Sequence, residues 1–278
     1  MITRLIPKRT FALSAALVAV LSVAACGTGE IPTPEEIKQE NTESRARQLV
    51  RVGDASRTGG DAASALGFYK RAQTKRPEWD IPYRRIGETA LALGLMADAA
   101  NAYSRLADLA PDDIDGLLGL GRALIALDKP DDASAAFSKA RSLAPKDHRP
   151  LNGLGVVHDL LGDHSAAQAS YRDGLALAPA SRSLANNYGL SLALSGQFDK
   201  AVDILGAAAK AADAGPRTRQ NLALVYGLSG DMDRAAQLGR LDLTEAQVQS
   251  NLKRYEALRK LSDKARARAV HTGKAPDG

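Results

Sequence analysis

A 34-residue period runs through most of this 278-residue chain and constrains its fold more than any other feature. One series of small residues that keeps this step consists of Gly53, Gly87, Gly121, Gly155 and Gly189, with Ala223 in the sixth place. Periods of about 20–50 residues are typical of repeats that stack, because a single repeat cannot bury its apolar face alone. We therefore expect a stack of similar units rather than one globular core.

Four more series share the period. Prolines recur at Pro77, Pro111, Pro145 and Pro179. Alanines recur at Ala65, Ala99, Ala133, Ala167, Ala201 and Ala235, and bulky rings follow at Tyr69, Tyr103, Phe137 and Tyr171. A second glycine series is Gly60, Gly94, Gly162, Gly196 and Gly230, with Asp128 in the third repeat. Glycine favours a helix end and proline stops a helix, so each repeat is expected to hold two helices.

The combined pattern resembles the tetratricopeptide repeat, a helix-turn-helix unit. The resemblance implies an all-α fold, a superhelical solenoid of about six helix-turn-helix repeats. Position by position, the units are 46–79, 80–113, 114–147, 148–181, 182–215 and 216–249. Since the sixth unit loses the pattern after Ala235, we place the solenoid at residues 46–242.

A capping helix is expected after the solenoid. The stretch LTEAQVQSNLKRYEALRKL, residues 243–261, opens with a capping box formed by Thr244 and Gln247. Val248, Leu252, Tyr255 and Leu258 then fall on one helical face. We predict one C-terminal capping helix over residues 243–268 and a disordered tail over 269–278.

The first 25 residues have the character of a signal peptide. Arg4, Lys8 and Arg9 precede the uncharged run FALSAALVAVLSVAA, which is short for a transmembrane helix. The run ends in Val-Ala-Ala-Cys26, which resembles the bacterial lipobox and implies a lipidated Cys26. The alternative is an ordinary secretory signal with an incidental cysteine. Gly27 follows instead of aspartate, so the resemblance implies a lipid anchor at the periplasmic face of the outer membrane. Residues 26–45 are expected to be a flexible tether.

Charge and motifs point away from nucleic acid and from catalysis. The formal charge of +5 falls to +2 without the three basic residues of the leader. The four histidines show no zinc-ligand spacing, and no nucleophile motif is visible. We therefore expect no enzyme, no metal, no cofactor and no nucleic-acid partner.

A binding surface remains as the expected functional site. In tetratricopeptide repeat solenoids the first helix of each unit lines the concave face. We predict a protein-binding groove formed by Arg84, Arg122, Arg149, Asn152, Val156, Asn186, Leu190, Arg217, Gln220 and Leu224. The amides would bond a peptide backbone and the apolar residues would supply burial. The alternative is that the apolar residues only pack helix against helix and that the amides are solvated.

The whole chain resembles the TadD lipoproteins of the Tad (Flp, tight adherence) pilus system. The resemblance rests on the lipobox, the repeats, the stretch SLANNYGLSLALSGQFDKAVDIL and the segment LDLTEAQVQSNLKRYEALRKL. It implies a non-enzymatic outer-membrane lipoprotein that helps the secretin channel assemble or localise, with secretin or other pilus assembly proteins as partners. An alternative is a lipoprotein scaffold for peptidoglycan hydrolases or another envelope complex. A periplasmic hydrolase, a third hypothesis, would need a second domain or an acid/base cluster, and the sequence shows neither.

Overall fold

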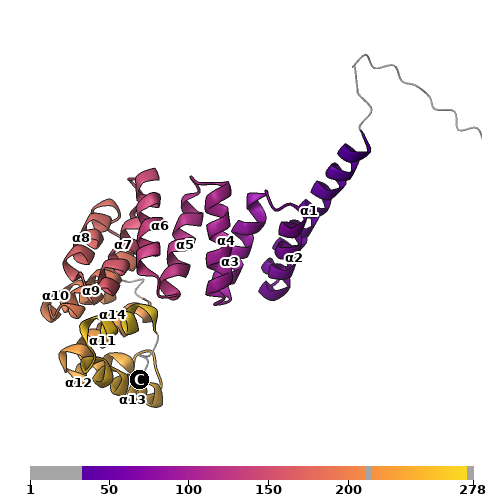
Figure 1. Cartoon of the computed structure of the whole chain (residues 1–278). Coiled ribbons are helices and arrows are strands. Elements are labelled where there is room, and N and C mark those ends of the chain that lie inside the picture. The colour runs from indigo at the N-terminus through magenta and orange to yellow at the C-terminus, as the bar shows by residue number, and fades with distance from the viewer. Residues whose placement is uncertain (1–32, 211–214, 274–278) are drawn as a thin grey trace, which may run out of the picture. The chain divides into compact units, whose positions relative to one another are not determined.

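The computed structural model describes residues 33–210 and 215–273 of the chain. Within these ranges it contains fourteen α-helices and no strand, so the predicted all-α class is confirmed (Figure 1). Residues 40–210 and 215–273 belong to one compact unit. The expected signal peptide and Cys26 lie outside the described residues, as do residues 26–32 of the expected tether. The prediction of a flexible tether is wrong for residues 34–45, which are helical because α1 begins at Pro34.

Twelve helices form the six repeats. The first helices of the successive units are α1 (Pro34–Thr58), α3 (Asp80–Ala92), α5 (Ile114–Ala126), α7 (His148–Leu161), α9 (Arg182–Leu194) and α11 (Pro216–Ser229). The second helices are α2 (Ala62–Lys75), α4 (Met96–Leu109), α6 (Pro130–Leu143), α8 (His164–Leu177), α10 (Phe198–Lys210) and α12 (Met232–Gly239). From α2 to α12 these bounds fall within the predicted 34-residue units, whereas α1 begins at Pro34, before the predicted first unit at 46.

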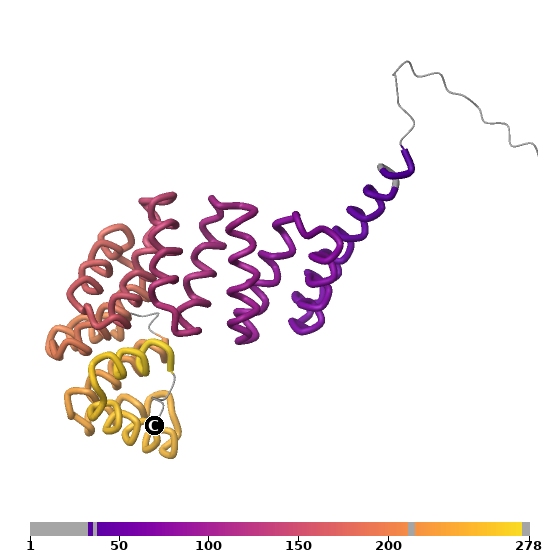
Figure 2. The backbone as a smooth tube through the Cα atoms, in the orientation of Figure 1, coloured from indigo at the N-terminus to yellow at the C-terminus, as the bar shows by residue number. Residues whose placement is uncertain are grey.

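The repeats stack in two layers, and consecutive helical hairpins lie side by side in Figure 2. Each helix from α2 to α12 packs against the next one in the chain. From α3 to α11, each first helix also packs against the first helix of the following unit. The first helices therefore make one continuous layer, and this layer carries the surface described below.

Close packing within a repeat explains the first glycine series. A Cβ placed on Gly87 of α3 would lie 2.6 Å from Cζ of Tyr103, which projects from α4. Tyr103 is 2 % exposed, so its ring has no room to move away. A small residue on the first helix and a ring on the second are thus one packing unit, and the period repeats both together.

The second glycine series ends the first helices. Gly60, Gly94, Gly162, Gly196 and Gly230 all adopt positive φ, which a side chain disfavours. Asp128 occupies this position in the third repeat with φ 62°. It is the one residue other than glycine with positive φ in the described ranges, a conformation that aspartate tolerates better than most residues.

The C-terminal region differs from the single helix expected over 243–268. It contains two helices, α13 (Glu245–Arg259) and α14 (Asp263–Thr272). The helix is interrupted at Lys260–Ser262. Ser262 is the N-cap residue of α14, and Asp263 is an acidic residue in its first turn. Helix α14 also extends to Thr272, into the segment expected to be a disordered tail.

Helix α13 covers the last repeat. The predicted capping box is present between Thr244 and Gln247. Helix α13 packs on α11 and α12, and its Tyr255 and Leu258 are buried there. Among the helices of the described ranges, none has the length and apolar character that crossing a membrane requires.

Candidate functional site

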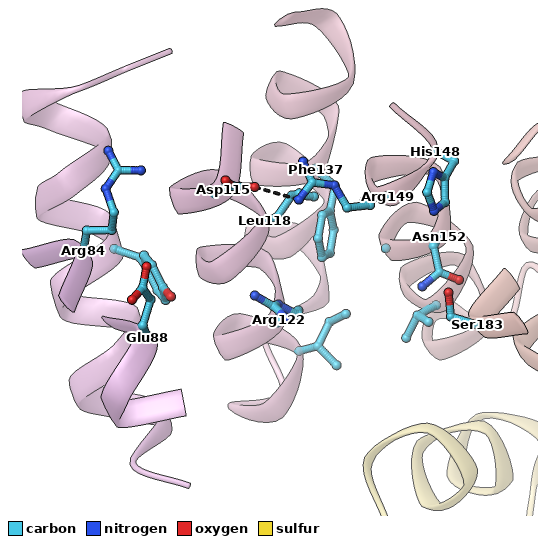
Figure 3. A pocket seen from close by; sticks show the side chains of 14 residues that line it. Arg84, Glu88, Asp115, Leu118, Arg122, Phe137, His148, Arg149, Asn152 and Ser183 are labelled. Atoms are coloured by element: carbon cyan, nitrogen blue, oxygen red, sulfur yellow. Dashed lines mark hydrogen bonds and ion pairs between the residues drawn. The ribbon is translucent and has the colours of Figure 1, made fainter. Parts of the chain in front are cut away.

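A groove lies on the first-helix layer of the second, third and fourth repeats (Figure 3). Its volume is about 390 Å³. Its charged and polar lining consists of Arg84, Glu88, Asp115, Arg122, His148, Arg149, Asn152 and Ser183. Apolar and aromatic side chains contribute between them, chiefly Tyr103, Leu118, Ile125, Phe137 and Val156. A hollow with apolar walls and several polar groups suits a peptide segment, which needs both burial and hydrogen bonds.

Two of the three groove arginines are engaged by carboxylates. Arg84 lies 2.7 Å from Asp113. Arg149 bridges Asp115 and Asp147, each at 2.7 Å, and the first of these ion pairs is drawn in Figure 3. The hydrogen bonds to Asp147 raise the pKa of Arg149 above its usual range. These pairs fix both guanidinium groups in place along the groove.

Arg122 differs from its neighbours. It is exposed on α5, and within the described residues it pairs with no carboxylate. The nearby Glu88 is held instead by Arg85 at 3.2 Å and by Arg57 at 3.8 Å. Burial, followed by the charge of Glu88, raises the pKa of Tyr103 to about 12, so its phenol is neutral at physiological pH. Arg122 therefore supplies a free positive charge in the groove.

The structure brings together half of the predicted groove residues. Arg84, Arg122, Arg149, Asn152 and Val156 line this one hollow. The other half lies further along the solenoid in different surroundings. Leu190 is buried and Leu224 is partly buried in the C-terminal core, while Arg217 is exposed. Gln220 lines a separate cavity of about 10 Å³ next to α13.

Asn186 lies in a buried hydrogen-bond network. It is 6 % exposed, and its amide nitrogen donates to the carbonyl of Arg182 at 2.8 Å and to Thr218 Oγ1 at 3.2 Å. Its amide oxygen accepts from Asn221 at 3.1 Å. One repeat earlier, Asn152 accepts a hydrogen bond from Asn187 at 2.9 Å but lines the groove. The two asparagines therefore share a repeat position and differ in access.

A buried carboxylate in the fourth repeat is a feature that the sequence analysis did not single out. Asp159 of α7 is 0 % exposed. Its Oδ1 lies 2.8 Å from His164 Nδ1 and 2.7 Å from Ser191 Oγ, and its Oδ2 lies 3.0 Å from His271 Nε2. The Tyr171 hydroxyl donates to Oδ2 at 3.2 Å. A carboxylate only accepts hydrogen bonds, so all four neighbours donate to it.

The electrostatics of this cluster favour the ionised carboxylate. Burial alone would raise the pKa of Asp159, but the hydrogen bonds from His164, His271 and Ser191 and the charge of His271 outweigh it and lower the pKa. Burial and the neighbouring Asp159 charge raise the pKa of Tyr171 well above its usual value.

The sequence does mark Asp159 as an exception. At the equivalent position the other repeats carry Arg57, Leu91, Ile125, Ala193 and Gly227, so Asp159 is the only acid among them. In the described ranges, no group of histidine, cysteine and acidic side chains is arranged to hold a metal ion.

Comparison with known sequences supports the repeat. Residues 90–155 and residues 153–217 each match a sequence model of the tetratricopeptide repeat. No curated protein matches the chain in sequence.

Solved structures show the same fold. The crystal structure of a MamA protein is 25% identical, with a TM-score of 0.54, over 60% of this chain and 91% of that one. A tetratricopeptide repeat protein from Parabacteroides merdae is 16% identical, with a TM-score of 0.64, over 78% and 91% of the two chains. Pseudomonas aeruginosa pilF is 16% identical, with a TM-score of 0.57, over 77% and 99%. Likeness at 16% identity shows the fold alone.

Proposed function

We propose that this tetratricopeptide repeat protein is a docking adaptor of the bacterial outer membrane, where it holds a segment of a protein partner in the groove of α3, α5 and α7. Proteins built from these repeats generally mediate protein–protein interaction, and their first-helix layers offer extended binding surfaces. The observation that carries the proposal is the groove of about 390 Å³, where fixed arginines border apolar walls. The proposal assigns the chain no catalytic step.

The groove favours a segment that carries a carboxylate. Arg84 and Arg149 are neutralised by Asp113, Asp115 and Asp147, whereas the charge of Arg122 is left for a partner. Leu118 and Val156 lie in the same hollow and can cover an apolar side chain. Asn152 offers an amide for a peptide backbone. A segment with an acidic residue next to an apolar one therefore matches the groove.

The membrane part of the proposal rests on the sequence around Cys26. A lipid on this cysteine would confine the solenoid to the membrane surface and raise its effective concentration near a membrane partner. The resemblance to the TadD lipoproteins makes the secretin or another Tad pilus protein the partner that we propose first. A cell-wall hydrolase is the partner expected if the chain is instead a scaffold for peptidoglycan enzymes.

Photo-crosslinking in cells tests the docking surface and identifies the partner. A photoreactive amino acid at position 122 should capture a protein, and the same group at position 172 on the exposed surface of α8 should not. Mass spectrometry then distinguishes a pilus secretin from a cell-wall hydrolase. Arg122→Glu should abolish capture by a group placed at position 152, while Arg172→Glu should leave it intact. Equal capture from positions 122 and 172 would contradict the groove assignment.

Membrane fractionation tests the anchor separately. Cys26→Ala should move the protein out of the outer-membrane fraction or block its processing. An unchanged amount in that fraction would contradict lipidation and leave the groove proposal standing.

A further inference from the structure

Helix α14 returns to repeats that lie far earlier in the sequence. It packs against α7 and α9, the first helices of the fourth and fifth repeats, as the yellow end of the chain shows in Figure 1. Ala267 is 0 % exposed, and Ala269, at 2 % exposure, belongs to the C-terminal core that α9, α11 and α13 share. Repeats of a solenoid normally contact only their neighbours, so the position of α14 is not required by the stacking itself.

One face of α14 carries the polar contacts with the repeats. His271 Nε2 lies 3.0 Å from Asp159 Oδ2, and Arg268 lies 2.9 Å from the carboxylate of Asp128. The Lys264 side chain lies beside Gly162, where an added Cβ would come within 3.4 Å of it. Lys264, Arg268 and His271 are spaced by four and three residues, which places them on the same side of a helix.

The surface that receives α14 suits a basic helix. Gly162 and Asp128 follow directly on the C-terminal ends of α7 and α5, where unpaired carbonyls give a partial negative charge. Asp128 and Asp159 add two carboxylates to it. We call the surface formed by Asp128, Asp159, Gly162 and Ser191 the latch site.

The latch site departs from the repeat where it meets α14. Asp128 stands in the positive-φ position that five other repeats give to glycine. Asp159 is the only acid at its own repeat position, and Ser191 replaces the Ala, Thr or Val found at the equivalent position of the other repeats. A buried carboxylate is costly unless partners surround it, and one of its partners comes from α14. Asp128 and Asp159 therefore contact α14 directly, and Ser191 supports Asp159 from the next repeat.

Helix α14 itself has the features of a detachable segment. It is ten residues long, which is short for a helix that is stable alone. It buries small alanine side chains, and its polar contacts with the repeats come from His271 and Arg268. Arg266 and Arg254 tie it to α13 through backbone carbonyls. Removing the contacts of His271 and Arg268 would release α14 from the latch site, while it stays joined to α13 and the repeats keep their own packing.

We propose that the latch site is a binding site for a short basic helix, and that α14 is its resident occupant and excludes other helices of the same pattern. The ligand class is a helix with small residues and a histidine placed as Ala267 and His271 are. Helix α7 carries both Asn152 of the groove and Asp159 of the latch site, so both sites share one rigid element. This inference concerns a surface outside the groove and does not depend on the proposed function.

The first test measures release of α14 in the full-length chain by hydrogen exchange of residues 263–272. His271→Ala should speed exchange there by roughly tenfold or more, because a hydrogen bond to a buried charge is lost. Ala267→Gln should have the same effect, because a longer side chain does not fit between α14 and the repeats. This variant keeps Asp159, His164 and His271 in the sequence. His148→Ala, the matched change in the groove, should have no effect on these amides. Unchanged exchange in both α14 variants would overturn the proposal.

The second test distinguishes a binding site from a merely structural contact. The probe is a fluorescent synthetic peptide of residues 261–273, and its binding is followed by anisotropy. The full-length Ala267→Gln chain should bind the peptide at least roughly tenfold more tightly than the wild-type chain, whose site is filled. A peptide carrying His271→Ala should lose this binding. Released α14 without peptide binding, or equal binding by both chains, would overturn the proposal.

Discussion

Asn187 donates a 2.9 Å hydrogen bond to Asn152, and Asn221 makes the equivalent bond to Asn186 at 3.1 Å one repeat later. This bond links first helices of neighbouring repeats. Asn186 is also bonded to Thr218, which is 3 % exposed, whereas Asn152 faces the groove. The two asparagines thus occupy the same repeat position, but Asn186 is buried between helices whereas Asn152 is accessible in the groove.

This difference predicts different effects on stability. Asn186→Ala should lower the free energy of unfolding by about 2 kcal/mol, because Thr218 and Asn221 lose a buried partner. Asn152→Ala should cost less than about 1 kcal/mol, because water can replace the lost bond. Urea unfolding followed by circular dichroism measures both values. Equal losses in the two variants would contradict the distinction.

The glycine series predicts a second difference. Gly87→Ala should destabilise the chain by about 2 kcal/mol, because the new Cβ would lie 2.6 Å from Tyr103. Gly67→Ala is the matched control, since this exposed glycine of α2 has open space around it. The control should gain up to about 1 kcal/mol from helix propensity. In thermal unfolding the melting temperature should fall for Gly87→Ala and rise for Gly67→Ala. A change in the same direction for both variants would contradict the packing described for Tyr103.

The buried carboxylate predicts a pH dependence. Asp159→Asn should cost roughly 3 kcal/mol at neutral pH, because four donors lose a charged acceptor. The groups that face Asp159 are His164 and Tyr171 of α8, Ser191 of α9 and His271 of α14. Together they lower its pKa below the ordinary 3.8. A lowered folded-state pKa stabilises the protein above the unfolded value, and the effect is lost as the pH falls through the folded value.

The measurement is the difference in unfolding free energy between the wild type and Asp159→Asn at several pH values. The difference should shrink as the pH falls below about 4. Tyr171→Phe removes one donor and keeps the charge, so it serves as a control with a smaller cost. A difference that does not change down to pH 3 would show that Asp159 is not the titrating group.

The fold was predictable because its determinants are local. Gly87 and Tyr103 lie 16 residues apart, and the period copies both, so a pattern within one repeat carries the packing. The repeat position marks Asp159 as an exception, but its partners were not predictable, since Ser191 and His271 are 32 and 112 residues away. The period also gives Asn186 and Asn152 the same repeat position. Their settings differ because Thr218 and Asn221 of α11 bond to Asn186, whereas Asn152 lines the groove. Repeat spacing thus specifies position along the layer, while access depends on side chains from other repeats.

Helix α13 supplies bulk that the sixth repeat lacks, and this gives the last prediction. Gly239 stands where the first four repeats carry a ring and the fifth carries Leu205, and Val248 of α13 packs against it. Tyr255 covers Gly227 of α11 and is 6 % exposed, and the cavity left between these helices is about 10 Å³. Tyr255→Ala should therefore cost about 3–5 kcal/mol and open the C-terminal end of the solenoid first. Tyr255→Phe should be nearly neutral, because the hydroxyl makes no hydrogen bond within the described residues. Hydrogen exchange should locate the loss in α11 and α12, and uniform exchange along all repeats would contradict a local capping role.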